Sequence, residues 1–217
     1  MRRGFKTWAE QQSVEARRLC GLPPDSPLRA KQFASGLNVE VLALADMPGF
    51  PPELETKLLK DFSDLWSAAT IPVGTDYVIV YNSAHTECRQ ESDLMHELAH
   101  IICGHQSTRL HPFGQTGLMM RSYNAEHEAE AEWLGACLQI PRNALLSLLR
   151  RDIGAEAICA LFGCSQQMLT FRRNTTGIDR QIAFGRGFGV RPVRRLRSAR
   201  DPRRVGPGAG GVSPVPR

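Results

Sequence analysis

The stretch ESDLMHELAHIICGH, from Glu91 to His105, carries two histidines four residues apart with a glutamate next to the first. On a helix, His96 and His100 lie one turn apart on the same face, so both imidazoles can bind a single metal ion. At about 100° per residue the opposite face gathers apolar side chains, which are Leu94, Leu98, Ile101 and Ile102. The stretch therefore predicts a helix that packs one face into the core and lines a cleft with the other. The alternative is a helix whose histidines simply face solvent.

A third metal ligand is expected on another helix, because catalytic zinc usually takes three protein ligands and keeps one position for water. The candidates lie in AEHEAEAEWLGACLQIP, residues 125–141, and are Glu126, His127, Glu128, Glu130 and Glu132. Glu128 and Glu132 share a helical face, near the small residues Gly135 and Ala136 that allow close approach to the first helix. Glu126 and Glu130 are expected to point the opposite way, toward solvent. We therefore predict Glu128 as the third ligand and Glu132 as a partner that orients a ligand imidazole.

The predicted chemistry is hydrolysis of a peptide bond. Glu97 lies beside both histidines, where it can act as the general base that takes a proton from water. The predicted metal is zinc, and manganese is the alternative because one carboxylate ligand and a second nearby carboxylate also suit that ion. The sequence leaves the group that stabilises the oxyanion open among Arg121, Tyr123 and His111.

Six cysteines are scattered along the chain without a C-x-x-C pair. This favours reduced thiols in a cytoplasm and argues against a cysteine-based zinc site. Cys103 is expected to be a small packing residue rather than a redox thiol, and His105 to stabilise the end of its helix rather than contact substrate. No apolar run approaches the roughly 20 residues of a membrane span, so we expect a cytoplasmic protein without membrane contact.

Hydrophobic patterning predicts an α+β fold with a small twisted sheet and surrounding helices. Strands are expected at 38–44 and 77–82, and the second of these, YVIVYN, is able to lie along the cleft and pair with an extended peptide. A long loop is expected at 106–124. Helices are expected at 5–20, 29–36, 53–65, 125–139, 143–151, 155–162 and 166–173. The first of them is amphipathic, with Trp8, Val14 and Leu19 among charges.

The chain is predicted to have three parts. Residues 1–141 form a metallopeptidase domain, 142–185 a helical, helix-turn-helix-like extension packed on it, and 186–217 a disordered tail rich in Arg, Pro and Gly. The tail holds nine arginines and one acid, so residues 1–185 carry 18 basic and 21 acidic groups although the net charge of the chain is +5. Weak nucleic-acid contact is therefore expected only through the tail. Arg172 and Arg173 could touch phosphates from a helix-turn-helix, but a helical hairpin that closes the core is the favoured interpretation.

Three stretches resemble the ImmA/IrrE family of metallo-endopeptidases. YVIVYNSAHTECRQESDLMHELAHIICGH, residues 77–105, is similar to the family's strand, asparagine, loop and H-E-x-x-H helix. EAEAEWLGACLQIP, residues 128–141, resembles its second helix, and AICALFGCSQQMLTFRRNTTG, residues 157–177, its C-terminal helical pair. The resemblance implies a compact zincin-like domain, with His96, His100 and Glu128 as metal ligands and Glu97 as general base. It also implies a narrow protein substrate, often a helix-turn-helix repressor that is cleaved to switch genes on.

Two departures from the family pattern stand near the expected site. Members often have an asparagine at the position of Glu132, and a Met-Pro pair where this chain has Ile140 and Pro141. Three functions stay open at this point: a site-specific regulatory protease, a non-catalytic anti-repressor that binds a repressor, and a DNA-binding regulator. The intact Glu97 favours the protease, since a binding module has no need of a general base.

Overall fold

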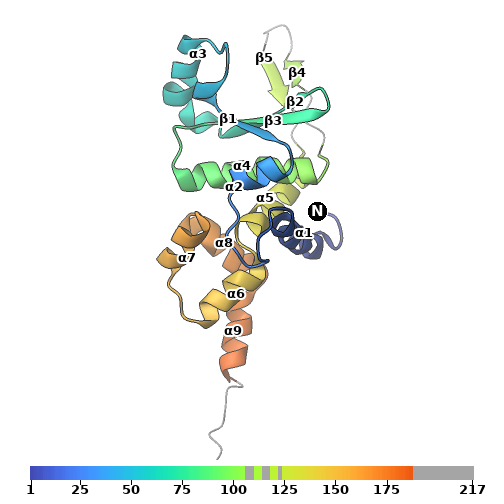
Figure 1. The fold of residues 1–217 in the computed structure, drawn as a ribbon, viewed down its shortest axis with the longest axis vertical. Coiled ribbons are helices and arrows are strands. Elements are labelled where there is room, and N and C mark those ends of the chain that lie inside the picture. Colours follow the sequence, from blue (N-terminus) through green and yellow to red (C-terminus); the bar gives the residue numbers. More distant parts are fainter. Residues whose placement is uncertain (106–109, 114–117, 122–123, 188–217) are drawn as a thin grey trace, which may run out of the picture.

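The computed structural model describes residues 1–105, 110–113, 118–121 and 124–187, which form an α+β fold around one central helix. This helix, α4 (Glu87–Ile102), carries a sheet on one side and α5 (Ala125–Gln139) on the other (Figure 1). Helix α1 (Phe5–Leu19) packs against α5, and α2 (Ala30–Gly36) against α4. The predicted α+β class is therefore confirmed, and the helix with the two histidines is its centre.

The three-stranded sheet has the order β1-β3-β2. The central strand β3 (Asp76–Tyr81) pairs in parallel with β1 (Glu40–Ala43) and antiparallel with β2 (Ala68–Val73). Because β3 has a neighbour on each side, the prediction that it pairs with an extended peptide is wrong. Among the described residues the unpaired edge beside α4 belongs to β2. This strand escaped sequence reasoning because Pro72 weakens its pattern, although proline is tolerated on an edge strand.

Two connecting segments frame the sheet. Between β1 and β2 the chain forms the short helical turns η1 (Leu44–Asp46), α3 (Pro52–Thr56), η2 (Lys57–Asp61) and η3 (Ser63–Leu65). After α4, the strands β4 (Leu110–Phe113) and β5 (Leu118–Arg121) pair antiparallel, with Leu110 opposite Arg121. The predicted loop at 106–124 is therefore wrong for these two strands. Tyr123 and the side chains of His111 and Arg121, which were the oxyanion candidates, lie outside what the structure describes.

The buried face of helix α1 consists of small side chains together with Phe5 and Arg17, and of the large residues that its pattern suggested only Trp8 packs, half-buried, against the core. Ala9, Ser13 and Ala16 are buried, whereas Val14 is 38% and Leu19 51% exposed. The Ser13 hydroxyl donates a hydrogen bond to a backbone carbonyl of α5 at 2.6 Å. Small side chains let the two helix backbones approach closely, so that α5 packs against α1 as well as against α4.

The C-terminal helices form a second apolar cluster beneath α5 (Figure 1). They are α6 (Arg142–Arg150), α7 (Ala155–Phe162), α8 (Gln166–Thr176) and α9 (Ile178–Gly187). Their shared core is made of Ile140, Ala144, Leu145, Ile158, Phe162, Cys164, Leu169 and Ile178. Helix α9 extends beyond the helices that the pattern predicted, and residues 188–217, most of the predicted tail, lie outside the described residues.

Arg172 anchors these helices to the rest of the fold. Its side chain is fully buried, pairs with Glu10 of α1 at 2.7 Å and donates to the carbonyl of Ile140 at 2.9 Å. Arg173 pairs with Asp179 at 2.9 Å. A buried, paired guanidinium cannot reach a phosphate, so the structure favours the hairpin that closes the core over a DNA-contacting helix. None of the described helices combines the length and the apolar character needed to cross a bilayer.

Candidate metal centre

Three side chains predicted from the sequence converge between α4 and α5. His96 Nε2 lies 3.0 Å from His100 Nε2 and 3.3 Å from Glu128 Oε2, and His100 Nε2 lies 3.6 Å from the same oxygen. The helical spacing on α4 supplies the two nitrogens, and the start of α5 supplies the carboxylate. The structure thus brings the two imidazoles and Glu128 together although 28 residues separate His100 from Glu128 in the sequence.

These three groups fit a divalent metal of the zinc type. In a tetrahedral site with bonds of about 2.0–2.1 Å, ligand atoms lie about 3.3 Å apart, close to the distances between the three donor atoms. The pKa of His100 is lowered, first by burial and then by the neighbouring His96, which favours the neutral imidazole that binds metals. His96, His100 and Glu128 are 31%, 19% and 39% exposed, so one side of the cluster stays open to solvent.

Gly135 sets the distance between the two helices that carry the cluster. A Cβ at this position would lie 3.2 Å from the backbone nitrogen of His96 and 3.2 Å from the carbonyl oxygen of Met95. Such distances are tighter than ordinary contacts, so only glycine leaves α5 this close to α4. The observed packing agrees with the prediction that small residues permit this approach.

The sheet holds Glu97 beside His96, His100 and Glu128, which together are the candidate metal-ligand cluster. Its carboxylate is mostly buried, and Oε2 accepts a hydrogen bond from the Thr70 hydroxyl of β2 at 2.5 Å. Within the described residues Oε1 makes no hydrogen bond. One oxygen is therefore fixed and the other is free to exchange a proton. Sequence reasoning missed Thr70 because β2 itself was not expected.

A cleft of about 620 Å³ opens from His96 and Glu97. Its lining comes from α4, from α5, from residues 64–68 and from Met168 of α8. Glu132 lines this cleft, is exposed, and makes no hydrogen bond or ion pair within the described residues. The structure therefore shows no bond from Glu132 to either ligand imidazole, which was its predicted role.

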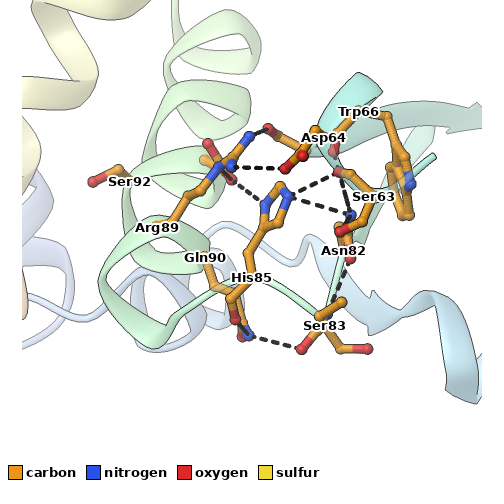
Figure 2. A network of polar contacts seen from close by, with 12 residues as sticks. Ser63, Asp64, Trp66, Asn82, Ser83, His85, Arg89, Gln90 and Ser92 are labelled. Atoms are coloured by element: carbon orange, nitrogen blue, oxygen red, sulfur yellow. Dashed lines mark hydrogen bonds and ion pairs between the residues drawn. The ribbon is translucent and has the colours of Figure 1, made fainter. Parts of the chain in front are cut away.

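Residues 63–66, of which 64–66 line the cleft, are tied to α4 by a polar network (Figure 2). The buried ring of His85 donates from Nε2 to the carbonyl of Ser63 at 3.0 Å, and its Nδ1 lies 3.3 Å from Asp93. The Asn82 amide donates to the same carbonyl at 3.0 Å. Arg89 bridges Asp93 at 3.9 Å and Asp64 at 4.0 Å. Sequence reasoning did not single out His85, because a lone histidine in a loop carries no spacing signal.

Glu130 contradicts the expectation that it faces solvent. Its side chain is only 3% exposed, and it accepts hydrogen bonds from the backbone nitrogen of Arg2 at 2.9 Å and from Arg2 Nε at 3.0 Å. Burial alone would raise its pKa, but the bonds from Arg2 and His105 outweigh it and lower the pKa to about 2. The helical wheel placed Glu130 correctly on the face away from Glu128. It could not show that the N-terminal residues and the end of α4 cover that face. Glu126, as expected, is exposed.

A second group of potential ligands lies next to the first. Atoms of Cys103, His105 and Glu130 lie within 4.8 Å of one another. Burial, followed by the charge of Glu130, raises the pKa of the Cys103 thiol to about 11, which disfavours the thiolate that a metal would need. Because Glu130 already pairs with Arg2, the group of Cys103, His105 and Glu130 is a poorer cation site than the cluster of His96, His100 and Glu128.

Comparison with known proteins places most of this architecture in one family. Residues 51–174, more than half of the chain, match the family model of a peptidase family described as the IrrE N-terminal-like domain. The matched segment runs from α3 to α8 and contains all the residues of the metal-ligand cluster, together with Glu97 and Thr70. Comparison with curated proteins gives no match.

Proposed function

The chain belongs to the peptidase family of the IrrE N-terminal-like domain, and from this membership we propose that it is a zinc-dependent endopeptidase, with manganese as the alternative metal. His96, His100 and Glu128 would hold the ion, and Glu97 would be the general base. The observation that supports this most directly is the convergence of the three donor atoms at 3.0–3.6 Å beside a carboxylate fixed by Thr70.

In the proposed reaction, the metal would polarise the substrate and the water, and side chains of the protein would transfer the proton. A bound zinc ion would act as a Lewis acid on the scissile carbonyl and lower the pKa of water. Glu97 takes the proton of the attacking water at its free oxygen and passes it to the leaving amine. The hydrogen bond from Thr70 keeps that free oxygen in place during both transfers. The partial burial of the cluster limits the water that can compete for it.

The substrate would be a protein segment in extended form. The outer edge of β2 has no partner strand among the described residues, and Thr70 on this strand lies beside Glu97. A peptide that adds to this edge by β-augmentation would carry its backbone across the metal-ligand cluster. The first candidate substrate is a helix-turn-helix repressor, because the family resemblance implies one, and cleavage would then control transcription in the cytoplasm.

The alternative functions receive less support. A non-catalytic anti-repressor needs neither Glu97 nor the Thr70 hydrogen bond that orients it. A DNA-binding regulator would use the C-terminal helices, but Arg172 is buried and paired with Glu10. Any weak nucleic-acid contact would have to come from the basic tail.

The experiment compares wild type with Glu97→Gln, using as substrate a helix-turn-helix repressor encoded next to this protein. We expect wild type to bind about one zinc ion per chain and to cleave the repressor at a defined bond, which mass spectrometry would identify. Glu97→Gln should bind zinc equally and cleave nothing. If both proteins relieve repression equally and neither cleaves the repressor, the anti-repressor function replaces the peptidase.

A further inference from the structure

The end of α4 folds back on one of the proposed metal ligands. Gly104 has a left-handed backbone with φ of 64°, the conformation that glycine adopts at little cost. The His105 nitrogen donates to the His100 carbonyl at 3.0 Å, and the Gly104 nitrogen donates to the Ile101 carbonyl at 3.0 Å. These two bonds define a Schellman motif, in which the side chains at the two ends of the longer bond meet. Here those side chains are His100 and His105.

The two rings are joined by a directed chain of polar contacts. His100 Nδ1 lies 3.0 Å from His105 Nδ1, and His105 Nε2 lies 3.3 Å from Glu130 Oε2. An ionised carboxylate only accepts, so His105 Nε2 carries the proton that it donates to Glu130. In the neutral ring Nδ1 of His105 is then an acceptor, and the donor to it is Nδ1–H of His100. This arrangement leaves the Nε2 lone pair of His100 facing His96 and Glu128.

From this geometry we propose that His105 is a positioning residue for the metal centre. It fixes the tautomer and the ring orientation of His100, with Glu130 behind it as the final acceptor. Ligand histidines in metal sites almost always donate their second ring N–H to a carboxylate, a backbone carbonyl or water. Here the imidazole of His105, backed by the carboxylate of Glu130, would take that place. The proposal rests on the proposed function, because it assumes that His100 binds a metal.

The surroundings of His105 make it a rigid partner. Glu130 is held by the backbone and the guanidinium of Arg2, with an ion pair of 3.0 Å. The His105 ring stacks on His127 with 4.2 Å between centroids and 5° between planes, and its side chain is only 5% exposed. A partner fixed on two sides can hold the orientation of His100 before any metal binds. The competing interpretation is that Cys103, His105 and Glu130 hold a second metal ion.

The test measures zinc affinity by competition with a chelator, and the visible spectrum of the cobalt-substituted full-length chain. His105→Phe keeps the ring that stacks on His127 but removes the acceptor for His100. We expect this variant to bind zinc about 10–100-fold more weakly, with a changed cobalt spectrum. The matched control, His127→Phe, keeps the stacking and leaves the contacts of His105 with His100 and Glu130 in place, and it should bind zinc within about twofold of wild type.

A measurement on wild type guards against a variant that fails to fold. In the metal-free protein, long-range proton–nitrogen NMR spectra should show the proton of His100 on Nδ1 and that of His105 on Nε2. A proton on Nε2 of His100 would overturn the proposal, as would wild-type zinc affinity in a folded His105→Phe. Two zinc ions per wild-type chain and one in His105→Phe would replace it with a second metal site. Wild type that binds no zinc would instead refute the proposed function, and the positioning role with it.

Discussion

Gly135→Ala tests whether the contact between α4 and α5 sets the geometry of the metal-ligand cluster. The added Cβ would lie 3.2 Å from the His96 nitrogen and the Met95 carbonyl oxygen, whereas ordinary contacts begin at 3.4 Å. Both neighbours are backbone atoms of a buried helix and cannot rotate away. Helix α5 must therefore move by about 0.2 Å or more, which equals the tolerance of about 0.2 Å on metal–ligand distances.

Two opposing effects of Gly135→Ala set the expected change in the free energy of unfolding. Overpacking of a well-packed contact costs about 1–3 kcal/mol, and replacing a helical glycine by alanine returns about 1 kcal/mol. We expect the free energy of unfolding to fall by about 1 kcal/mol in urea, and zinc affinity to fall about tenfold, because Glu128 moves with α5. Chelator competition and urea denaturation on the same protein would measure both quantities.

Gly36→Ala is the matched control for this substitution. Gly36 is also helical, but a Cβ there would meet only the side chains of Cys20 and Leu19 at 3.4 Å and 3.6 Å. This variant should gain about 0.4–1 kcal/mol of stability with unchanged zinc affinity. If Gly135→Ala behaves like Gly36→Ala in both measurements, the inference that this contact positions Glu128 is refuted.

Three further predictions concern other parts of the fold. Thr70→Val removes a hydrogen bond worth about 1 kcal/mol, so kcat should fall about fivefold while zinc affinity stays the same; a loss of zinc binding would place Thr70 in the metal site instead. Arg172→Leu leaves Glu10 without its buried partner and should lower the free energy of unfolding by about 3 kcal/mol in urea, and an unchanged midpoint would contradict the anchoring role of Arg172. Burial raises the pKa of the Cys137 thiol from 9.0 to about 12. The protonated Cys137 thiol therefore makes its full contribution to the free energy of unfolding below pH 9. This contribution is lost as the pH rises toward 12, at about 1.4 kcal/mol per pH unit. Denaturation at pH of about 8 and about 11 should show a smaller decline for Cys137→Ala, and equal declines would refute this assignment.

Local periodicity made part of the fold predictable. The spacing of His96 and His100, with Leu94 and Leu98 opposite, indicated both the metal-ligand face and the core face of α4, and the two leucines are buried as expected. The same helical reasoning separated Glu128 from its acidic neighbours. The burial of the two leucines and the convergence of Glu128 with both imidazoles agree with this reasoning, because each depends on the geometry of a single helix with 3.6 residues per turn. The role of the three side chains as metal ligands stays a prediction.

Features that depend on distant contacts were missed. Strand β2 gave a weak signal because Pro72 interrupts it, and it forms because the register of β3 opposes each of its residues from Ala68 to Val73. The wheel showed that Glu130 lies opposite Glu128, but Arg2 covers that face across 128 residues of sequence. A local sequence pattern cannot predict which distant residues will pack on a given face of a helix.

The sequence by itself determined which chemical groups the site contains: two imidazoles one turn apart, a carboxylate beside them, and a second carboxylate on a helix with small residues. Only the tertiary structure decided how these groups are held. It placed Thr70 on Glu97, His105 on His100 and Arg2 on Glu130. The physical reason is that ligand type and helical spacing are properties of a few neighbouring residues. The orientation of each ligand, by contrast, depends on hydrogen-bond partners that only the folded chain brings within reach.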